Sequence, residues 1–188
     1  MARAALRILD ELGLPDLTMR RLAADLGVQP SALYWHYPNK QTLLAELADR
    51  IVHRGAAEQS TAGWDERVRQ EALALRGALL AYRDSAEIVS SSLALGLGEN
   101  PAHRRLRGAF EGGPFDPATV ASAAATMLHF VLGHVSLEQQ RSHYDRLGAL
   151  EGRTVPLEAS EGDFLFGVDT IIAGLRQRAA SAAEALGG

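Results

Sequence analysis

Cysteine is absent from the 188 residues of this chain, which excludes a disulfide framework and a thiolate metal site and fits a reducing compartment. We also expect no window with the roughly 18 apolar residues that a membrane span needs. The opening stretch MARAALRILDELG is interrupted by charged side chains and is therefore not expected to be a signal peptide. These absences predict a cytoplasmic protein that does not contact a membrane.

Signals for catalysis are equally scarce. The LGLGE stretch at 95–99 has two glycines but no preceding strand pattern, so a nucleotide-binding loop is not expected. None of the six histidines forms an i, i+4 pair on one helix, since His129 and His134 are five residues apart. We therefore predict no metal and no cofactor. With neither a nucleophile elbow nor a paired-carboxylate motif, an enzyme has little support.

The charge distribution separates one region from the rest. The net charge of −4 argues against a protein that binds nucleic acid without specificity. Residues 1–54 nevertheless hold seven Lys/Arg and six Asp/Glu, whereas the remainder of the chain has a net charge of −5. The segment from Thr18 to Lys40 contains three basic residues and one acidic residue. The least acidic part of the chain thus surrounds the aromatic run YWHY at 34–37.

Apolar residues at helical spacing predict an all-α chain in two parts, at 1–52 and at 60–182. The small, polar stretch 53–63 is the expected boundary. In the second part we expect a long helix through Val68 and Tyr82, short helices at 84–93 and 101–111, and a helix of about 24 residues opened by Asp116-Pro117. A charged loop at 141–162 and a last helix capped by Asp163 complete the prediction.

Three short helices in the first 40 residues, with a compact turn at Gly27, predict a helix-turn-helix. In its third helix Leu33 and Tyr37 are four residues apart and share the inward face. A rotation of about 100° per residue then places Ser31, Tyr34 and Trp35 on the outward arc. Exposed aromatic side chains on this helix are explained if it is the one that enters the DNA major groove.

The run LTMRRLAADLGVQPSALYWHYPNKQTLLAELA resembles the DNA-binding domain of the TetR family, whose hallmark is a Leu-Tyr-x-His-aromatic run, a short turn, a Lys and paired leucines. The stretches GWDERVRQEALALRGALLAYRD and FLFGVDTIIAGLRQ are more weakly similar to the C-terminal domain of its tetracycline-repressor branch. The resemblance implies a helix-turn-helix DNA-binding domain at 1–52 and a helical ligand-binding and dimerisation domain at 60–182. The resemblance implies phosphate contacts for Thr18 and Lys40 and a base contact for Arg20. Tyr34 and His36 would touch backbone or base methyl groups.

The residues ahead of the Leu-Tyr pair depart from the tetracycline repressor, because this chain has Gln29, Pro30, Ser31 and Ala32 there. Proline has no N–H and alanine offers only a methyl group, so base reading would fall mainly to Arg20, Gln29 and apolar contacts. A different operator sequence is implied.

The resemblance predicts a ligand-responsive transcriptional regulator, with repression as the expected mode, that binds a palindromic double-stranded DNA operator as a homodimer. The alternative is a small α-helical enzyme or ligand-carrying protein that retains the fold. We expect the dimer interface on the helices at 117–139 and 163–178. Its predicted contact residues are Val120, Ala124, Val131, Phe164, Val168 and Ile172.

In the tetracycline-repressor branch the drug arrives with Mg²⁺, held by polar residues and a histidine. The positions of this chain that match those contacts are Ala56, Glu71, Leu75 and Val89. Three of these side chains are aliphatic, and an aliphatic side chain cannot ligate a hard cation. We therefore expect a largely apolar small-molecule effector, with Glu71 and His134 as polar anchors. The predicted pocket residues are Leu75, Leu79, Tyr82, Val89, Phe110, Met127 and Phe130. The identity of the effector, the operator sequence, the regulated genes and the choice between repression and activation stay open.

Three glycines interrupt the helical patterns of the C-terminal part, at Gly133, Gly167 and Gly174. Each costs up to about 1 kcal/mol relative to alanine inside a helix. Either this cost is simply tolerated, or the glycines allow two helices to approach closely at an interface.

Overall fold

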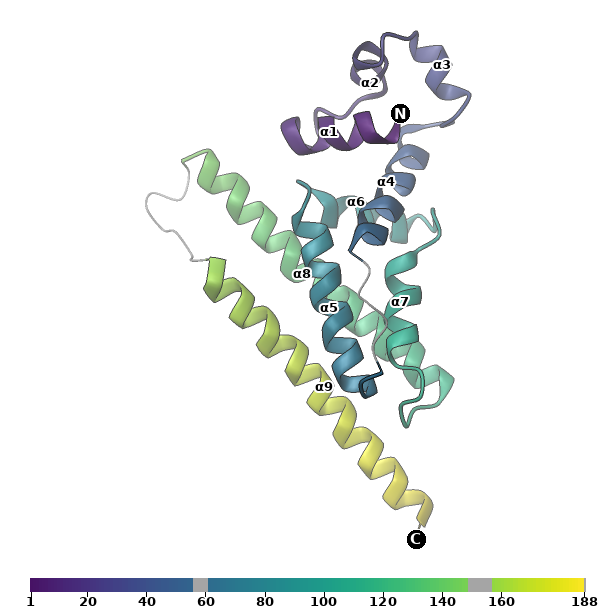
Figure 1. The fold of residues 1–188 in the computed structure, drawn as a ribbon, viewed down its shortest axis with the longest axis vertical. Helices are drawn as coiled ribbons and strands as arrows, with labels where there is room; N and C mark the ends of the chain where they lie inside the picture. The colour runs from purple at the N-terminus through teal and green to yellow at the C-terminus, as the bar shows by residue number, and fades with distance from the viewer. Residues whose placement is uncertain (56–60, 149–156, 188) are drawn as a thin grey trace. The chain divides into compact units, whose positions relative to one another are not determined.

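A computed structural model of the chain describes residues 1–55, 61–148 and 157–187, and these residues form helices joined by turns, without a strand (Figure 1). The all-α prediction is confirmed for this part of the chain. Residues 56–60 of the predicted boundary at 53–63, and Ala56 with them, lie outside the described residues.

The helices divide between two compact units. The first unit comprises residues 1–55 and 77–101, and the second comprises residues 56–76 and 102–188. The first unit contains α1 (Ala2–Leu12), α2 (Met19–Asp25), α3 (Pro30–Tyr34), α4 (Lys40–Arg54) and α6 (Ser85–Ala94). The second holds most of α5 (Trp64–Leu80) and α7 (Pro101–Ala109), together with α8 (Pro117–Arg146) and α9 (Leu157–Gly187). Within the first unit α4 packs against both α1 and α6.

Local sequence signals set the ends of the first helices. The Thr18 side chain accepts a hydrogen bond from the Arg21 N–H at 3.1 Å, which is the predicted N-cap of α2. Leu17 and Leu22, on either side of this cap, are both fully buried, as a hydrophobic staple requires. Asn39 caps α4 through a 2.8 Å hydrogen bond from the Thr42 N–H. The starts of α2 and α4 therefore follow from short-range chemistry.

Helix α3 is shorter than the predicted one, because it ends at Tyr34 and residues 35 and 36 form a turn. The Tyr37 N–H still donates to the Leu33 carbonyl at 2.9 Å, so the helical rotation continues through this turn. The predicted faces are confirmed: Leu33 and Tyr37 are buried, whereas Tyr34 is 50% exposed and Trp35 is 89% exposed. The aromatic run thus has two sides, one in the core and one in solvent.

The second unit corrects the predicted helix lengths. Helix α8 spans 30 residues rather than about 24, and α9 begins at Leu157, before the expected cap at Asp163. Of the predicted loop at 141–162, only residues 147 and 148 are described as non-helical. The sequences that extend the two helices are rich in Glu, Gln and Arg, which are good helix formers even without an apolar stripe.

Helix α8 also corrects the expectation about apolar windows. Its segment Pro117–Arg146 contains an 18-residue window with a mean hydropathy of 1.5, of which 39% is buried. It is the one helix among the described residues with the length and composition of a membrane span, a test that core helices of soluble proteins also pass. No Lys, Arg, Asp or Glu occurs between residues 117 and 137.

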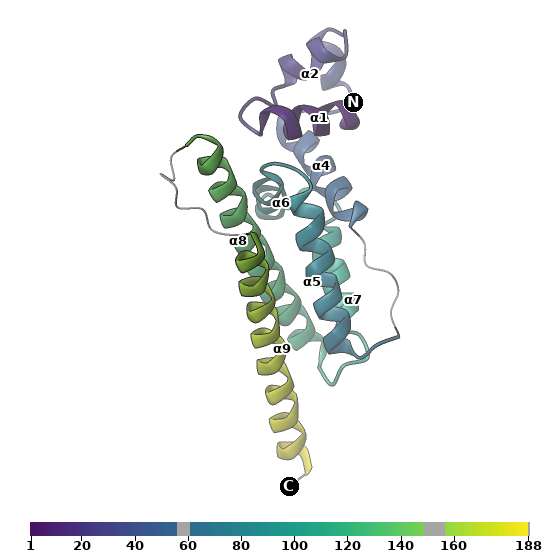
Figure 2. The same ribbon diagram turned by 60° about the vertical axis from the view of Figure 1, so that its left-hand side comes forward.

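Helix α9 packs against α8 within the second unit (Figure 2). A Cβ atom added at Gly167 would lie 2.2 Å from Cζ of Phe130 on α8, so only glycine fits against this ring. Gly133 and Gly174 have no atom within 4 Å of such a Cβ atom. Of the two explanations for these glycines, the close approach of two helices applies at Gly167, and both helices belong to the same chain.

Candidate nucleic-acid interface

The arginines of α2 differ in what they contact. Arg21 forms an ion pair with Asp16 at 3.0 Å, and Arg7 of α1 forms hydrogen bonds of 2.6 and 2.7 Å to the Asp25 carboxylate. Arg20 is exposed and has no acidic partner within the part of the chain that the structure describes. Arg20 is thus the arginine of this helix whose five N–H donors stay available, as a base contact requires.

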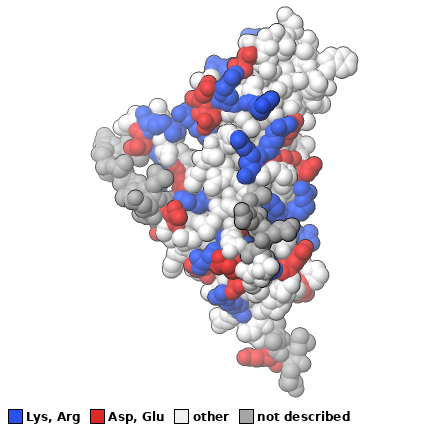
Figure 3. Space-filling view, in the orientation of Figure 1, with Lys and Arg blue, Asp and Glu red and all other residues white. Residues whose placement is uncertain are grey.

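Helix α3 presents an uncharged, partly aromatic surface. No Asp, Glu, Lys or Arg occurs from residue 26 to residue 39, and the tip that carries α3 shows no charged side chain on the face in view in Figure 3. The predicted contact residues at its N-terminus and on its outer arc are all exposed: Gln29, Pro30, Ser31, Ala32, Tyr34, Trp35 and His36. Without a carboxylate there, the helix can approach a phosphate backbone without repulsion.

The buried side of this surface is fixed to α4 by a hydrogen bond. The Tyr37 hydroxyl donates to Glu46 Oε2 at 2.6 Å, and Arg50 Nε donates to Glu46 Oε1 at 2.8 Å. Burial, and then the Glu46 carboxylate, raise the pKa of Tyr37 to about 12. Glu46 was not among the predicted site residues, because a lone acid on an exposed helical register carries no signal for a partner nine residues away.

Lys40 stands at the first position of α4, where free N–H groups and the helix dipole favour an anion. Its Nζ atom donates to the Leu14 carbonyl at 3.3 Å. An ammonium group has three donors, so two remain for a phosphate. The predicted phosphate contact is compatible with this position, and it stays a prediction.

Comparison with known proteins agrees with this geometry. Residues 2–47 match the family described as bacterial regulatory proteins, tetR family, and residues 57–163 match the tetracyclin repressor-like C-terminal domain. The chain belongs to the TetR family. It is therefore a helix-turn-helix transcriptional regulator with a ligand-binding domain, and its relatives are regulators, not enzymes.

Two relatives and one solved protein illustrate the similarity. The chain is 37% identical over 146 residues to the class C tetracycline repressor of Escherichia coli, covering 76% of this chain and 66% of that repressor. It is 33% identical to the class G repressor of Vibrio anguillarum, with 94% and 92% of the two chains covered. The crystal structure of Mycobacterium smegmatis BioQ superimposes with a TM-score of 0.83 at 40% identity, covering 93% and 94% of the chains. BioQ solved with its double-stranded DNA operator gives a TM-score of 0.74 at 37% identity, with the same coverage.

The predicted effector residues of this TetR-family chain are shared between the two units. Leu79, Tyr82 and Val89 belong to the first unit. The second unit contains Glu71, Leu75, Phe110, Met127, Phe130 and His134. Among all of these, Leu75, Leu79, Val89, Phe110 and Met127 are buried apolar side chains. The pocket that combines both groups stays a prediction.

Glu71 is a buried carboxylate in the second unit. Arg105 Nε of α7 lies 2.7 Å from Glu71 Oε1, yet this oxygen receives no aligned hydrogen bond. Burial raises the pKa of Glu71, and the nearby Arg105 opposes part of that rise. The Glu71 carboxylate is thus already held by the Arg105 guanidinium, and its role as a polar anchor for an effector stays a prediction.

His134 is already held by other side chains. Its Nε2 atom lies 3.1 Å from Glu138 Oε1, and its ring packs edge-on against Phe164. Arg76 of α5 donates two hydrogen bonds from Nη2 to the Glu138 carboxylate at 3.0 and 3.1 Å, and its guanidinium lies 5.3 Å from the Phe164 ring centroid. This buried network joins α5, α8 and α9. The network was not predicted from the sequence, although the charge of Arg76 within the apolar run LALRGALL indicates that this side chain needs a buried partner.

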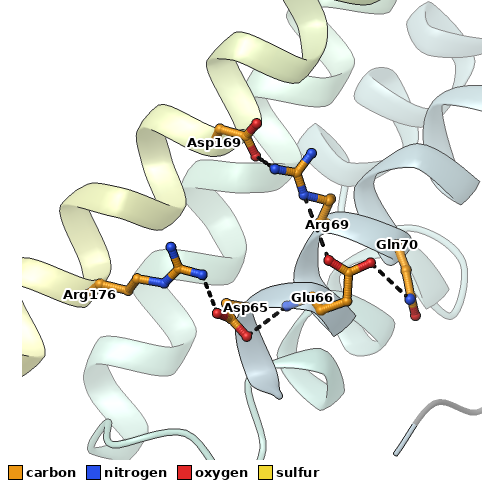
Figure 4. Close-up of polar contacts among 6 residues, drawn as sticks. All are labelled: Asp65, Glu66, Arg69, Gln70, Asp169 and Arg176. Carbon is orange, nitrogen blue, oxygen red and sulfur yellow. Dashed lines mark hydrogen bonds and ion pairs between the residues drawn. The ribbon is translucent and has the colours of Figure 1, made fainter. Parts of the chain in front are cut away.

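The N-terminal part of α5 is joined to the middle of α9 by ion pairs (Figure 4). Arg176 contacts Asp65, and Arg69 contacts both Asp169 and Glu66. The hydrogen bond from Arg176 is the main reason why the pKa of Asp65 is lowered. These contacts fix one face of α9 to its own chain, so that the opposite face is the one left for a partner.

The residues predicted for dimerisation lie mostly inside the single chain. Val120 is half-buried, whereas Ala124, Val131, Phe164, Val168 and Ile172 are buried. A side chain without exposed surface has no area to offer a second copy, so direct contacts fall to exposed neighbours on the same helices. Among the described residues no group of three or more His, Asp or Glu side chains is arranged to hold a metal ion.

Proposed function

We propose that this chain is a homodimeric repressor that acts in the cytoplasm, binds a palindromic operator through α2 and α3, and is released by a largely apolar small molecule. The observation that carries the proposal is the two-sided helix α3. Leu33 and Tyr37 anchor it, while Tyr34 and Trp35 are exposed to solvent. Arg20 of α2 is exposed as well, and it has no acidic partner among the residues that the structure describes. We propose no catalytic role for the chain.

Dimerisation is supported by the outer faces of α8 and α9. The exposed row of α8 is Ser122, Thr126, His129, Gly133 and Leu137, which follow each other at helical spacings of three or four. Leu137 is 58% exposed, and Phe166 on α9 is 74% exposed. A pair of helices of this length, with an uncharged and partly apolar row on α8, is suited to pack with its symmetry mate as a four-helix bundle. Two copies would also supply two recognition helices for the two half-sites of an operator.

A groove on the same side of the second unit supports this surface. It is lined mostly by small side chains, which include Ala118, Ser122, Ala123 and Thr126 of α8, and by Ile171 and Leu175 of α9. Small residues allow helix backbones to approach closely, so that larger side chains of a second copy can fill the groove.

The effector is proposed to differ from the tetracycline–Mg²⁺ complex, although tetracycline repressors are among the relatives. Leu75 and Val89 are buried aliphatic side chains and offer no lone pair to a cation. The buried apolar residues favour an apolar body, and the buried Glu71–Arg105 pair favours a polar group on it.

Binding to DNA from upstream of the protein's own gene tests the proposal. The full chain is titrated into labelled upstream fragments in a fluorescence-anisotropy assay, with random duplexes of equal length as competitors. A specific site should be preferred over random duplexes by about 10³-fold or more. Equal affinity for upstream and random DNA would contradict the proposal, and it would favour a ligand-carrying protein that kept the fold.

A further inference from the structure

The backbone of one residue in the first unit, Leu14, is held on both sides by charged side chains. The Leu14 N–H, in the loop between α1 and α2, donates to Asp84 Oδ2 at 2.7 Å. The Leu14 carbonyl accepts from Lys40 Nζ at 3.3 Å. Asp84 precedes α6, and Lys40 begins α4, so Leu14 links the start of α6 to the start of α4. All three residues belong to the same compact unit.

The backbone around this contact is specialised for it. Asp84 has a φ of 54°, a left-handed conformation that is uncommon for a residue with a side chain. It occupies the N-cap position of α6, but its side chain makes no capping hydrogen bond there. Instead the carboxylate reaches Leu14. Gly13, next to Leu14, has a φ of 88°, and a Cβ atom added there would lie 3.1 Å from Asp84 Oδ2. Glycine at position 13 therefore leaves room for the carboxylate.

We infer that Asp84 is a positioning residue for operator binding, which acts through Leu14 on Lys40. Its carboxylate holds the Leu14 N–H and so fixes the Leu14 backbone, and the carbonyl on the other side of the Leu14 Cα in turn holds the Lys40 ammonium at the N-terminus of α4, ready for a DNA phosphate. This inference rests on the proposed function. It goes beyond it by naming the contact through which the start of α6 influences the DNA-binding surface. A displacement of α6 would release Leu14 and lower the phosphate affinity of Lys40.

The sign of the effect separates this role from simple electrostatics. Asp84 carries a negative charge, so its removal would strengthen DNA binding if only long-range repulsion mattered. Positioning predicts the reverse, a weaker complex. Glycine adopts left-handed backbone without strain, so Asp84→Gly removes the carboxylate while the turn keeps its conformation. Asparagine also tolerates this conformation and keeps an acceptor oxygen, so Asp84→Asn should retain binding.

Asp49 provides a matched control in the same unit. Its Oδ2 atom accepts a hydrogen bond from the Glu99 N–H at 2.9 Å, close to Gly98, which has a φ of 79°. The chemistry repeats that at Asp84: a carboxylate contacts a backbone N–H beside a left-handed glycine. This contact does not involve the backbone of Leu14. Asp49→Ala should affect stability without any specific link to Lys40.

The test is a double-mutant cycle measured as DNA affinity. Parent, Asp84→Gly, Asp84→Asn, Lys40→Met and the double variant Asp84→Gly/Lys40→Met are titrated by fluorescence anisotropy against the duplex that the parent binds best. This duplex is taken from the upstream region or selected from a pool of random duplexes. Far-ultraviolet circular dichroism and thermal unfolding confirm that each variant is folded. The same cycle is run with Asp49→Ala in place of Asp84→Gly.

Asp84→Gly should weaken binding roughly 2- to 30-fold, and Asp84→Asn should stay within about twofold of the parent. The double variant should bind no more weakly than Lys40→Met alone, because the two residues act in series. Asp49→Ala and Lys40→Met should instead combine multiplicatively. The slope of log affinity against log salt should fall by up to about 0.9 per lost phosphate contact in Asp84→Gly.

Tighter binding by Asp84→Gly, or multiplicative effects of Asp84→Gly and Lys40→Met, would overturn the inference and leave the proposed function intact. A parent that binds no duplex from either source would overturn both. A Lys40→Met variant with parental affinity would also overturn the inference, since Lys40 would then make no phosphate contact to position.

Discussion

Removal of one member of the buried Arg76–Glu138 pair should destabilise the second unit strongly. The two side chains are only 9% and 11% exposed, and three hydrogen bonds of 3.0 to 3.2 Å join them. Glu138→Leu leaves the Arg76 guanidinium buried, with the exposed Glu161 carboxylate at 3.7 Å as its remaining acidic neighbour. An unpaired buried charge costs about 3–5 kcal/mol of unfolding free energy, and partial compensation by Glu161 favours the lower end, about 3 kcal/mol.

The double variant Arg76→Met/Glu138→Leu removes both charges and should lie within about 1 kcal/mol of the parent, because two apolar side chains of similar volume replace the pair. Urea unfolding monitored by Trp64 fluorescence in a Trp35→Phe background reports on the second unit, since Trp64 packs with Phe110 and Phe115 there. All variants are compared at one protomer concentration, because dimerisation contributes to apparent stability.

The exposed Arg7–Asp25 pair serves as the control, with side chains that are 55% and 28% exposed. Arg7→Met should cost only about 0.2–1 kcal/mol. A loss below about 1 kcal/mol for Glu138→Leu, or a double variant as unstable as the single one, would refute the reasoning that charge burial makes this pair matter.

Three further predictions concern the dimer, the recognition helix and the effector. Leu137→Glu combined with Phe166→Glu should give a folded monomer by light scattering, since both side chains are exposed in one chain, and a variant that stays dimeric would exclude this surface. The phenolic proton of Tyr37 should be lost near pH 12 by nuclear magnetic resonance, and because its folded pKa lies above the ordinary 10, its stabilising contribution should be present below pH 10 and lost as the pH rises to about 12. Glu46→Leu should bring this pKa closer to 10, and an unchanged value would show that the carboxylate has no effect. Tetracycline with Mg²⁺ should not release the protein from its operator, whereas release at micromolar drug that a chelator abolishes would contradict the proposed effector class.

Local patterns in the sequence predicted the DNA-binding part well. The caps at Thr18 and Asn39 and the opposite faces of Leu33 and Trp35 depend on neighbours within four residues, so spacing alone is informative. The ends of α8 and α9 were predicted poorly. Their outer turns are largely polar, so no apolar stripe marks them, although nothing in them interrupts a helix.

Contacts between residues that are far apart in the chain could not be predicted from the sequence. Arg76 and Glu138 are separated by 62 positions, and no local pattern indicates that these two charges meet. The apolar stripes of α8 and α9 were assigned to a second copy, but a stripe does not tell whether the chain itself or a partner covers it. Val131 and Ile172 are in fact covered by their own chain, which transfers the proposed dimer contacts to the exposed rows.

The most direct test of the central claim is whether Arg20 reads a base. The affinity of Arg20→Ala is measured by fluorescence anisotropy against a set of operators that differ by one base pair each, with Arg21→Ala as the control, because Arg21 is paired with Asp16. Loss of a bidentate base contact should relax the preference at one position of each half-site by roughly 1–3 kcal/mol, while the preferences elsewhere stay as in the parent. Arg21→Ala should keep the parental selectivity. If Arg20→Ala discriminates among all operator variants as well as the parent does, the account of operator reading by α2 and α3 is wrong.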